Sequence, residues 1–425
     1  MRPELTPLQI AFTDNPLVGG SFLTARLTAL KVIGKYIWLL FFPVHLSADY
    51  SYNQIPLFTG NLRTWGDWQV AFTALVIGAV GLLAVYSWRR DRRWLFFIGL
   101  GALGLAPVSN IAKLIGTIMA ERFLYIPAVA FAGCMVLTGL LVVHRFPSAE
   151  RRVIPVIALL ITLTFCIRTW ARNSDWATSR TMWASMAKTV PNSYKAHAFF
   201  FGSTIDEALN DCEAALAIVR PLPDRMSTPV PYINAGVAYR KKGEAVAQTS
   251  PADAARWYHR SLDTLFEGQR IARAVGFRHS DLDEQLGVTY TRLRDYSLAI
   301  RALRDAQRLD TKEEMTRELS DAYVQSGDTH NGEIALWEGI LADPGNQHIS
   351  GWLLDLYQRS EAGSCALQPQ PGGWAMNPSC PLVHDELCSA SAAVFRNFQG
   401  RGLAPQAAEL RNAGISQFGC SAELY

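Results

Sequence analysis

The residues of this sequence that are best suited to chemistry are an adjacent carboxylate and guanidinium, Glu121 and Arg122. They come directly before an apolar run that continues from residue 123 to residue 143. A charged pair beside hydrocarbon is costly unless it faces water, protein or a charged ligand, so a binding site is one interpretation. The other interpretation is an ion pair at the membrane interface that only marks the start of a helix. The sequence by itself leaves both open.

Arg122 and Asp49 indicate what kind of chemistry such a site would perform. The guanidinium of Arg122 presents a bidentate fork that matches phosphate oxygens, and Glu121 is placed to orient it. Asp49 follows the first apolar segment and is the other carboxylate that we nominate. The alternative for Asp49 is a turn residue at the end of a helix. We therefore expect an anion site at Arg122, with Glu121 and Asp49 as candidate catalytic carboxylates.

The distribution of apolar and charged residues decides the broad class of the protein. Of 425 residues, 49% are hydrophobic and 18% are charged, and the apolar residues are concentrated before residue 172. Residues 1–180 carry 17 Lys and Arg against 8 Asp and Glu, whereas the rest of the chain carries 23 against 29. The basic residues lie in short loops beside apolar runs, so we expect no nucleic acid partner. The sequence predicts a basic membrane half followed by a mildly acidic soluble half.

Five apolar segments precede residue 172, and the charges between them define an orientation. The segments cover residues 22–43, 68–88, 94–107, 123–143 and 153–167. An uncharged helix of about 20 residues rises about 30 Å, which matches the hydrocarbon layer. Basic clusters at residues 89–93 and 144–152 place that side in the cytoplasm by the positive-inside rule. Asp49, Glu121 and everything after Arg168 are then expected in the periplasm or exterior, or in the ER lumen.

Two of these segments are ambiguous. Lys31 and Lys35 leave residues 22–43 as either a spanning helix with snorkelling lysines or a partly embedded, re-entrant helix. Residues 94–107 are few and rich in glycine, which indicates a broken or closely packed helix. The predicted number of spans is therefore four or five.

The soluble half contains a helical repeat. Gly287, Ala299 and Ala306 occupy positions where the two helices of a tetratricopeptide (TPR) unit press together. A second copy is offset by 33 residues, an earlier copy lies at residues 234–239, and a weaker one begins at residue 191. Stacked units of this kind form a superhelix whose concave groove binds an extended polypeptide. The alternative is a superhelix whose groove is not used for binding.

Four cysteines, Cys365, Cys380, Cys388 and Cys420, lie in the segment after the repeats. In an extracytoplasmic setting they are expected to form two disulfides, for which three pairings are possible. No closely spaced pair of cysteines or histidines accompanies them, so we do not expect zinc there. The three remaining cysteines lie in apolar or helical settings that are typical of core residues.

Six motifs in the membrane half carry a family resemblance. They are Asp-Asn-Pro-Leu at residues 14–17, Ser-Phe-Leu-Thr-Ala-Arg-Leu-Thr at 21–28, Leu-Leu-Phe-Phe-Pro at 39–43, Leu-Ser-Ala-Asp-Tyr-Ser at 46–51, Gln-Ile-Pro at 54–56 and Ala-Glu-Arg-Phe-Leu-Tyr-Ile-Pro at 120–127. In these motifs, in their order and in the repeats that follow, the chain resembles the transmembrane and TPR-containing O-mannosyltransferases over about residues 12–360. Members of that family are multispanning glycosyltransferases of the GT-C type. They transfer mannose from a polyprenyl (dolichyl) phosphate to Ser or Thr hydroxyls of proteins.

The resemblance implies a donor, an acceptor and site residues. The expected donor is a polyprenyl (dolichyl) phosphate-linked sugar in the membrane, and the expected acceptor is a protein or peptide bound in the TPR groove. Glycosyl transfer needs a carboxylate near the acceptor hydroxyl and a cation at the leaving phosphate. We therefore expect Glu121 and Asp49 to be catalytic and Arg122 and Tyr125 to bind the lipid phosphate, without a metal ion.

One feature that the resemblance implies is missing from this sequence. Such enzymes are expected to carry an acidic pair in the first extracytoplasmic loop, and this chain begins downstream of that loop. Two hypotheses follow: a membrane glycosyltransferase or its N-terminally truncated part, and a non-catalytic membrane-anchored TPR scaffold for extracytoplasmic partners. The predicted fold is all-α in both cases. It comprises a polytopic membrane helix bundle at residues 1–172, an extracytoplasmic TPR superhelix at 173–360 and a Cys-containing tail or cap at 361–425.

Overall fold

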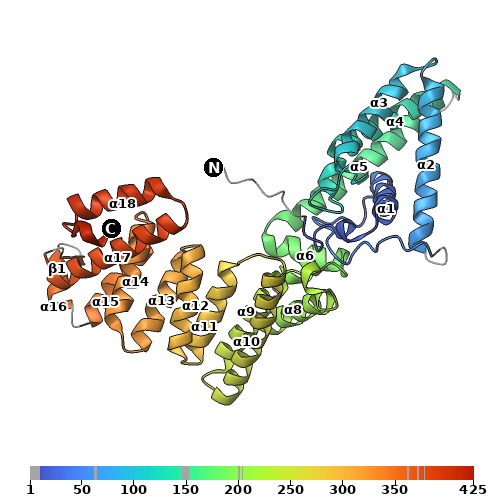
Figure 1. Ribbon diagram of the computed structural model, residues 1–425. Helices are drawn as coiled ribbons and strands as arrows, with labels where there is room; N and C mark the ends of the chain where they lie inside the picture. Colours follow the sequence, from blue (N-terminus) through green and yellow to red (C-terminus); the bar gives the residue numbers. More distant parts are fainter. Residues whose placement is uncertain are drawn as a thin grey trace. The chain divides into compact units, whose positions relative to one another are not determined.

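A computed structural model of the protein describes residues 10–61, 65–145, 153–199, 202, 204–360, 363–370, 373–377 and 379–425. It divides into two compact units, unit 1 ending at Ala235 and unit 2 beginning at Gly236. Nearly all the regular structure in both units is helical, and Figure 1 shows one small two-stranded hairpin near the C-terminus. The all-α prediction is confirmed. The predicted domain boundaries after residues 172 and 360 remain predictions.

Unit 1 contains five long helices followed by shorter ones. The helices are α1 (Phe22–Phe41), α2 (Trp65–Ser87), α3 (Arg92–Leu105), α4 (Tyr125–Arg145), α5 (Val153–Asn173), α6 (Ser179–Thr189), α7 (Tyr194–Ala198) and α8 (Ile205–Val219). Short 3-10 turns lie between them at η1 (Pro16–Gly19), η2 (Ala106–Val108), η3 (Glu121–Leu124), η5 (Ser174–Trp176) and η6 (Asp224–Met226). These bounds refer to the described part of the chain.

Within the described part of unit 1, three segments are long and apolar enough to span a membrane. They are Gly66–Ser87, Glu121–Val143 and Pro155–Trp176. Many of their large apolar side chains are exposed in the folded chain, including Leu82 and Val85 on α2. A continuous exposed apolar surface of this kind suits contact with lipid and not with water. The chain is a membrane protein, as its sequence predicts.

The two segments that are ambiguous in the sequence, α1 and α3, both make close contacts within unit 1. The 14 residues of α3 rise only about 21 Å, and α3 packs along α4 (Figure 1). A Cβ at Gly133 would lie 2.3 Å from the ring of Phe97, so only glycine permits this close packing of α3 on α4. In α1, Lys31 is buried and donates to the carbonyl oxygen of Pro56 at 3.1 Å, so it is bound within the protein and does not snorkel.

Loops at one end of the unit 1 helices are joined to the segment that follows α5. Tyr50 pairs with Met119 in an antiparallel bridge, and the Arg168 guanidinium donates to the Pro43 carbonyl at 3.2 Å. The hydroxyls of Ser51 and Ser193 lie 2.5 Å apart. This layer of loops, which we call the loop layer, comprises residues 43–58, 106–121 and 190–197. The basic residues 89–93 are at the other end of α2, and residues 146–152 of the second predicted basic cluster lie outside the described residues.

Unit 2 is a stack of antiparallel helices that begins within α9. The helices are α9 (Val230–Val246), α10 (Pro251–Ala274), α11 (Ser280–Arg292), α12 (Tyr296–Leu309), α13 (Glu313–Gln325), α14 (Thr329–Ala342), α15 (Gln347–Arg359), α16 (Gly363–Ala366), α17 (Pro381–Gly400), α18 (Ala404–Ser416) and η7 (Ala422–Leu424). The hairpin strands β1 (Leu367–Gln370) and β2 (Gly373–Met376) are antiparallel, with Leu367 opposite Met376.

The repeat that the sequence predicts is present in α11 to α14. α13 begins 33 residues after α11, and α14 begins 33 residues after α12. Ala299 and Ala306 are fully buried, and a Cβ at Gly287 would lie 2.5 Å from Cγ of Leu303. The small residues therefore stand where the paired helices approach most closely, and the TPR prediction is confirmed.

The cysteine-containing tail continues this stack. Disulfides join Cys365 to Cys380 and Cys388 to Cys420, which is one of the three possible pairings. A buried cluster connects α14, α15 and α17 and includes Leu336, Trp337, Leu353, Tyr357 and Val383. The tail is therefore folded against the last repeat helices.

Candidate functional site

Tyr36 fixes the backbone directly before the predicted site. Its side chain is fully buried in α1, and its hydroxyl donates to the carbonyl oxygen of Ala120 at 3.3 Å. The N–H of Ala120 donates back to the same hydroxyl at 2.9 Å. Both backbone groups of Ala120 are thus satisfied by one side chain, which sets the start of η3 and therefore the direction of Glu121 and Arg122.

Glu121 is held by the loop that follows α1. Its Oε1 atom accepts from the backbone N–H of Ser47 and from the hydroxyl of Tyr50, both at 2.7 Å. Burial raises the pKa of Tyr50, with Glu121 adding to the effect, so this hydroxyl donates as a neutral phenol. No ion pair joins Glu121 to Arg122 among the residues that the structure describes. The interfacial ion pair considered from the sequence is therefore not what holds Glu121.

Arg122 and Tyr125 face outward from the same short turn. Tyr125 is 84% exposed, and the Arg122 side chain is also exposed, with its guanidinium 5.3 Å from the centroid of the Phe123 ring. Residues three apart eclipse one another in a 3-10 turn, so these two side chains occupy one face at the start of α4. Within the described chain, no hydrogen bond or ion pair uses the Arg122 guanidinium. Its donors are available to an anion.

Asp49 is the candidate whose surroundings are most unusual. Its Oδ2 atom is buried and has no hydrogen-bond partner, and Nζ of Lys195 lies 3.8 Å away. Burial raises the pKa of Asp49, while Lys195 and Arg122 lower it and Asp14 raises it further. Arg122 is thus close enough to act electrostatically on this carboxyl. A buried carboxylate oxygen without a donor is costly, and such an oxygen is expected where a ligand supplies the donor.

Sequence reasoning missed the other members of this group, Asp14 and Lys195. Nζ of Lys195 lies 2.7 Å from Oδ1 of Asp14, and the Tyr194 hydroxyl donates to the same oxygen at 3.3 Å. Asp14 belongs to the first motif of the membrane half, so its motif was a usable signal. Lys195 belongs to the weak repeat copy that begins at residue 191, where the first helix, α7, has only five residues. The segment that begins at residue 191 therefore forms part of the loop layer and also contributes α7, which packs against α8.

Asn15, which follows Asp14 in the first motif, has a structural role. Its Nδ2 atom donates to Oδ1 of Asn110 at 3.0 Å and to the Ile115 carbonyl at 2.8 Å. Asn110 in turn donates to the Thr117 carbonyl at 3.1 Å. These buried bonds join the N-terminal segment to the loop that leads to Glu121.

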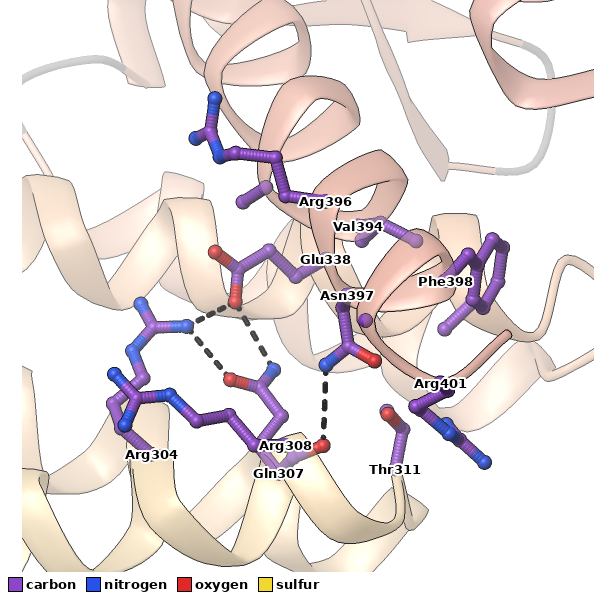
Figure 2. A pocket seen from close by; sticks show the side chains of 13 residues that line it. Arg304, Gln307, Arg308, Thr311, Glu338, Val394, Arg396, Asn397, Phe398 and Arg401 are labelled. Carbon is purple, nitrogen blue, oxygen red and sulfur yellow. Dashed lines mark hydrogen bonds and ion pairs between the residues drawn. The ribbon is translucent and has the colours of Figure 1, made fainter. Parts of the chain in front are cut away.

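Unit 2 contains a second candidate site, a cavity of about 440 Å³ between α12, α14 and α17 (Figure 2). On one side of the cavity, the polar side chains bond to one another. Arg304 forms an ion pair with Glu338 and donates to Gln307 at 2.8 Å, while Gln307 donates to Glu338 at 3.0 Å. This part of the lining is therefore rigid and nearly neutral.

The other side of the cavity presents unused polar groups. Arg396 and Arg401 are exposed, and the described residues provide neither with an ion-pair partner. Asn397 donates to the Gln307 carbonyl at 3.2 Å, but its Oδ1 atom is buried without a partner. Figure 2 shows Arg396 and Asn397 on α17 and Arg401 directly after its last residue. The lining suits a ligand that brings carboxylates to the arginines and a donor to Asn397.

Comparisons with known proteins agree with the family that the motifs indicated. The chain is 26% identical over 278 residues to protein O-mannosyl-transferase TMTC3 of Mus musculus, across 63% of this chain and 28% of that protein. It is 31% identical over 198 residues to TMTC4 of Mus musculus, across 44% and 26%. It is 29% identical over 190 residues to protein O-mannosyl-transferase F38B6.6 of Caenorhabditis elegans, across 43% and 25%. The resemblance to these O-mannosyltransferases is confirmed.

The chain spans about a quarter of the length of these relatives. No family model matches it. Among solved structures, a thermophilic TPR protein of Thermus thermophilus aligns with 46% of this chain and 97% of its own, with 16% identity and a TM-score of 0.38. That score is too low to support an argument about the fold.

Proposed function

We propose that this chain provides the donor-phosphate site and the acceptor-binding repeats of a membrane glycosyltransferase. In this proposal the enzyme transfers mannose from a polyprenyl (dolichyl) phosphate to Ser or Thr hydroxyls of proteins. The names of the relatives, protein O-mannosyl-transferases, support the reaction class. The observation that carries the proposal is the buried Oδ2 of Asp49, which pairs with Lys195 at 3.8 Å but has no hydrogen-bond partner, within the electrostatic reach of the exposed Arg122.

The reaction assigns a distinct step to each side chain. The acceptor oxygen attacks the anomeric carbon of mannose, the bond from that carbon to the phosphate oxygen breaks, and the polyprenyl phosphate leaves. Asp49 takes the proton of the acceptor hydroxyl, and its raised pKa makes it a better base than an ordinary aspartate. Arg122 and Tyr125 donate to the leaving phosphate. Glu121 keeps the loop that carries Asp49 in place through Ser47 and Tyr50.

Unit 2 is proposed to bind the acceptor polypeptide, with the cavity of Figure 2 as one contact point. Arg396 and Arg401 favour acidic residues in that polypeptide, since guanidinium groups bind carboxylates bidentately. The loop layer and unit 2 are proposed to lie outside the cytoplasm. The two disulfides support an oxidising compartment, and the basic residues 89–93 support a cytoplasmic opposite end.

Substitution of Arg122 by lysine tests the donor site. The change Arg122→Lys keeps the charge but removes the fork, and the loss of such a contact costs about 1.5 to 3 kcal/mol, or about 10- to 150-fold in affinity. The measurement is binding of polyprenyl-phosphate mannose to the full chain in detergent, alongside the thermal midpoint. Arg89→Lys at the opposite end of α2 is the matched control and should bind like wild type. Unchanged binding by a folded Arg122→Lys protein would contradict the phosphate role.

The scaffold hypothesis predicts a different pattern in the same preparation. A non-catalytic TPR scaffold binds acidic peptides through Arg396 and Arg401 but does not bind the lipid-linked sugar at all. Peptide binding should then weaken in the double variant Arg396→Gln, Arg401→Gln. It should persist in the control Arg411→Gln, because Arg411 is an exposed residue of α18 outside the cavity. Peptide binding by wild type without any donor binding would replace the enzyme proposal with the scaffold.

A further inference from the structure

A cluster of ligand-type side chains joins α14 to α17 and shares no residue with the cavity of Figure 2. His330 and Glu333 are three residues apart on α14, and Glu386 comes from the first turns of α17. One ligand atom from each of the three side chains lies within 4.8 Å of the other two. The cluster therefore has two carboxylates and one imidazole facing a common point.

The two carboxylates are buried and incompletely satisfied. Glu333 is 3% exposed and Glu386 is 1% exposed. Oε2 of Glu386 accepts from the Tyr357 hydroxyl at 2.6 Å, and its Oε1 lies 3.1 Å from Nδ1 of His330. Oε1 of Glu333 is buried without any hydrogen-bond partner.

Two buried carboxyl groups in contact require either a shared proton or a cation. A proton shared by Glu333 and Glu386 would leave one negative charge on the pair and would not involve His330, whereas a divalent ion neutralises both carboxylates and also binds a ring nitrogen of His330. Two large apolar side chains of a buried cluster, Leu336 and Trp337, follow Glu333 by three and four residues on α14. A positive charge at this point therefore removes a larger penalty than it would at the surface.

The donor set and its spacing fit a transition metal. An imidazole nitrogen with carboxylate oxygens suits Zn²⁺, Mn²⁺ or Fe²⁺, whereas Mg²⁺ and Ca²⁺ prefer oxygen ligands alone. Two tetrahedral ligands about 2.1 Å from zinc lie about 3.4 Å apart, close to the 3.1 Å between Nδ1 of His330 and Oε1 of Glu386. The His330 side chain is 58% exposed, which leaves an entry path and room for a water ligand.

We propose that His330, Glu333 and Glu386 bind one divalent transition-metal ion, with Zn²⁺ as the reference ion, and that the ion fastens α17 to α14. The site is structural and goes beyond the proposed transferase function, because none of its residues belongs to the donor site or to the cavity. Tyr357 is the positioning residue, since its hydroxyl holds the second oxygen of Glu386 and itself accepts from Nε1 of Trp337 at 2.8 Å.

The test is a zinc titration of the full chain in detergent after removal of metals with a chelator. Wild type should bind one zinc ion per chain, and its thermal midpoint should rise with zinc concentration because the ion binds only the folded state. His330→Gln lies on the exposed side of the cluster and is expected to fold normally. It should weaken binding by more than the roughly 10- to 100-fold that loss of an outer-shell partner causes. Glu386→Gln should abolish the rise in thermal midpoint.

His348→Gln is the matched control, because His348 also lies beside a glutamate, Glu313, at 2.9 Å but on the exposed surface without a third ligand. Its zinc binding should equal that of wild type. A wild type that binds no more zinc than the His330→Gln protein would overturn the site. The proposed site would also be overturned if the Glu333→Gln protein were more stable than wild type and zinc raised the thermal midpoint of neither protein. That result would identify a proton-sharing pair.

Discussion

The hydrogen bonds of Glu121 allow the effect of its substitution on the free energy of unfolding to be approximated. Glu121→Ala leaves the Ser47 N–H and the Tyr50 hydroxyl without an acceptor in a partly buried loop. Each charge-assisted bond contributes about 1.5 to 3 kcal/mol, so the loss of both should lower the free energy of unfolding by about 3 to 6 kcal/mol. Glu121→Gln keeps an acceptor oxygen and should lose about 1 kcal/mol. The thermal midpoint of each variant in detergent measures the difference.

Tyr50→Phe separates the two bonds, because it removes one donor and leaves the Ser47 bond intact. It should fall between Glu121→Gln and Glu121→Ala in stability. If Glu121→Ala is as stable as wild type, the positioning role assigned to Glu121 is wrong. If Glu121→Gln is fully stable but inactive in transfer, Glu121 is a catalytic group and not only a positioning one.

At the scale of single residues, the sequence pointed to individual charged residues but not to the residues that contact them in the folded chain. Glu121, Arg122 and Asp49 were nominated because each is a charge next to an apolar segment, and their roles remain predictions. Lys195 was not, because it follows the last apolar segment and reaches Asp49 only through the folding of the loop layer. The proposed metal cluster was missed for the same reason, since Glu386 lies on a different helix from His330.

At the scale of single helices, Glu284 makes the stability of the repeats depend on pH. It lies on α11, is 8% exposed, and has Nζ of Lys312 at 3.9 Å. Burial raises its pKa to about 7, and Lys312 opposes the effect only in part. The unfolded chain has a glutamate pKa of about 4.3, so the folded state keeps the proton longer. The free energy of unfolding therefore falls as pH rises from about 4 to about 7 and is level above that.

Glu284→Gln removes this titration and should make the repeats relatively more stable at high pH. The stability gain over wild type should be on the order of 1 to 3 kcal/mol larger at pH 8 than at pH 5. Denaturant unfolding followed by circular dichroism at the two pH values measures it. Glu409→Gln, which changes an exposed glutamate on α18, is the control and should show no such difference. An equal effect of Glu284→Gln at both pH values would contradict the buried-acid explanation.

The helices themselves were predictable where a period or a length constrained them. The 33-residue offset located α11 to α14 because each TPR unit must place small residues at the contact of its two helices. The close packing of α3 on α4 agrees with two of its glycines, since an added Cβ would lie 3.3 Å from Ala130 at Gly101 and 2.9 Å from Ile126 at Gly104. The tail was less predictable, because its hairpin and α17 are positioned by two disulfides and by burial against α14, none of which has a sequence period.

At the scale of the whole molecule, the main question is which side of the membrane holds the loop layer. His45 belongs to the loop layer and is exposed, and Arg89 is exposed at the other end of α2. The basic residues 89–93 favour a cytoplasmic location for that end, since positively charged loops are retained there. The proposed donor site, and an oxidising compartment for the disulfides of the tail, predict that the loop layer lies on the opposite side of the membrane.

Cysteine labelling tests this topology directly. The free cysteines Cys134, Cys166 and Cys212 are first replaced by alanine, so that only introduced thiols react. An impermeant maleimide applied to the cytoplasmic side of sealed membranes should then label Arg89→Cys and not His45→Cys. Both should react equally after the membrane is permeabilised, which controls for burial. Labelling of His45→Cys alone would put the loop layer in the cytoplasm, and the lipid-phosphate site would then face the wrong side for an extracytoplasmic acceptor.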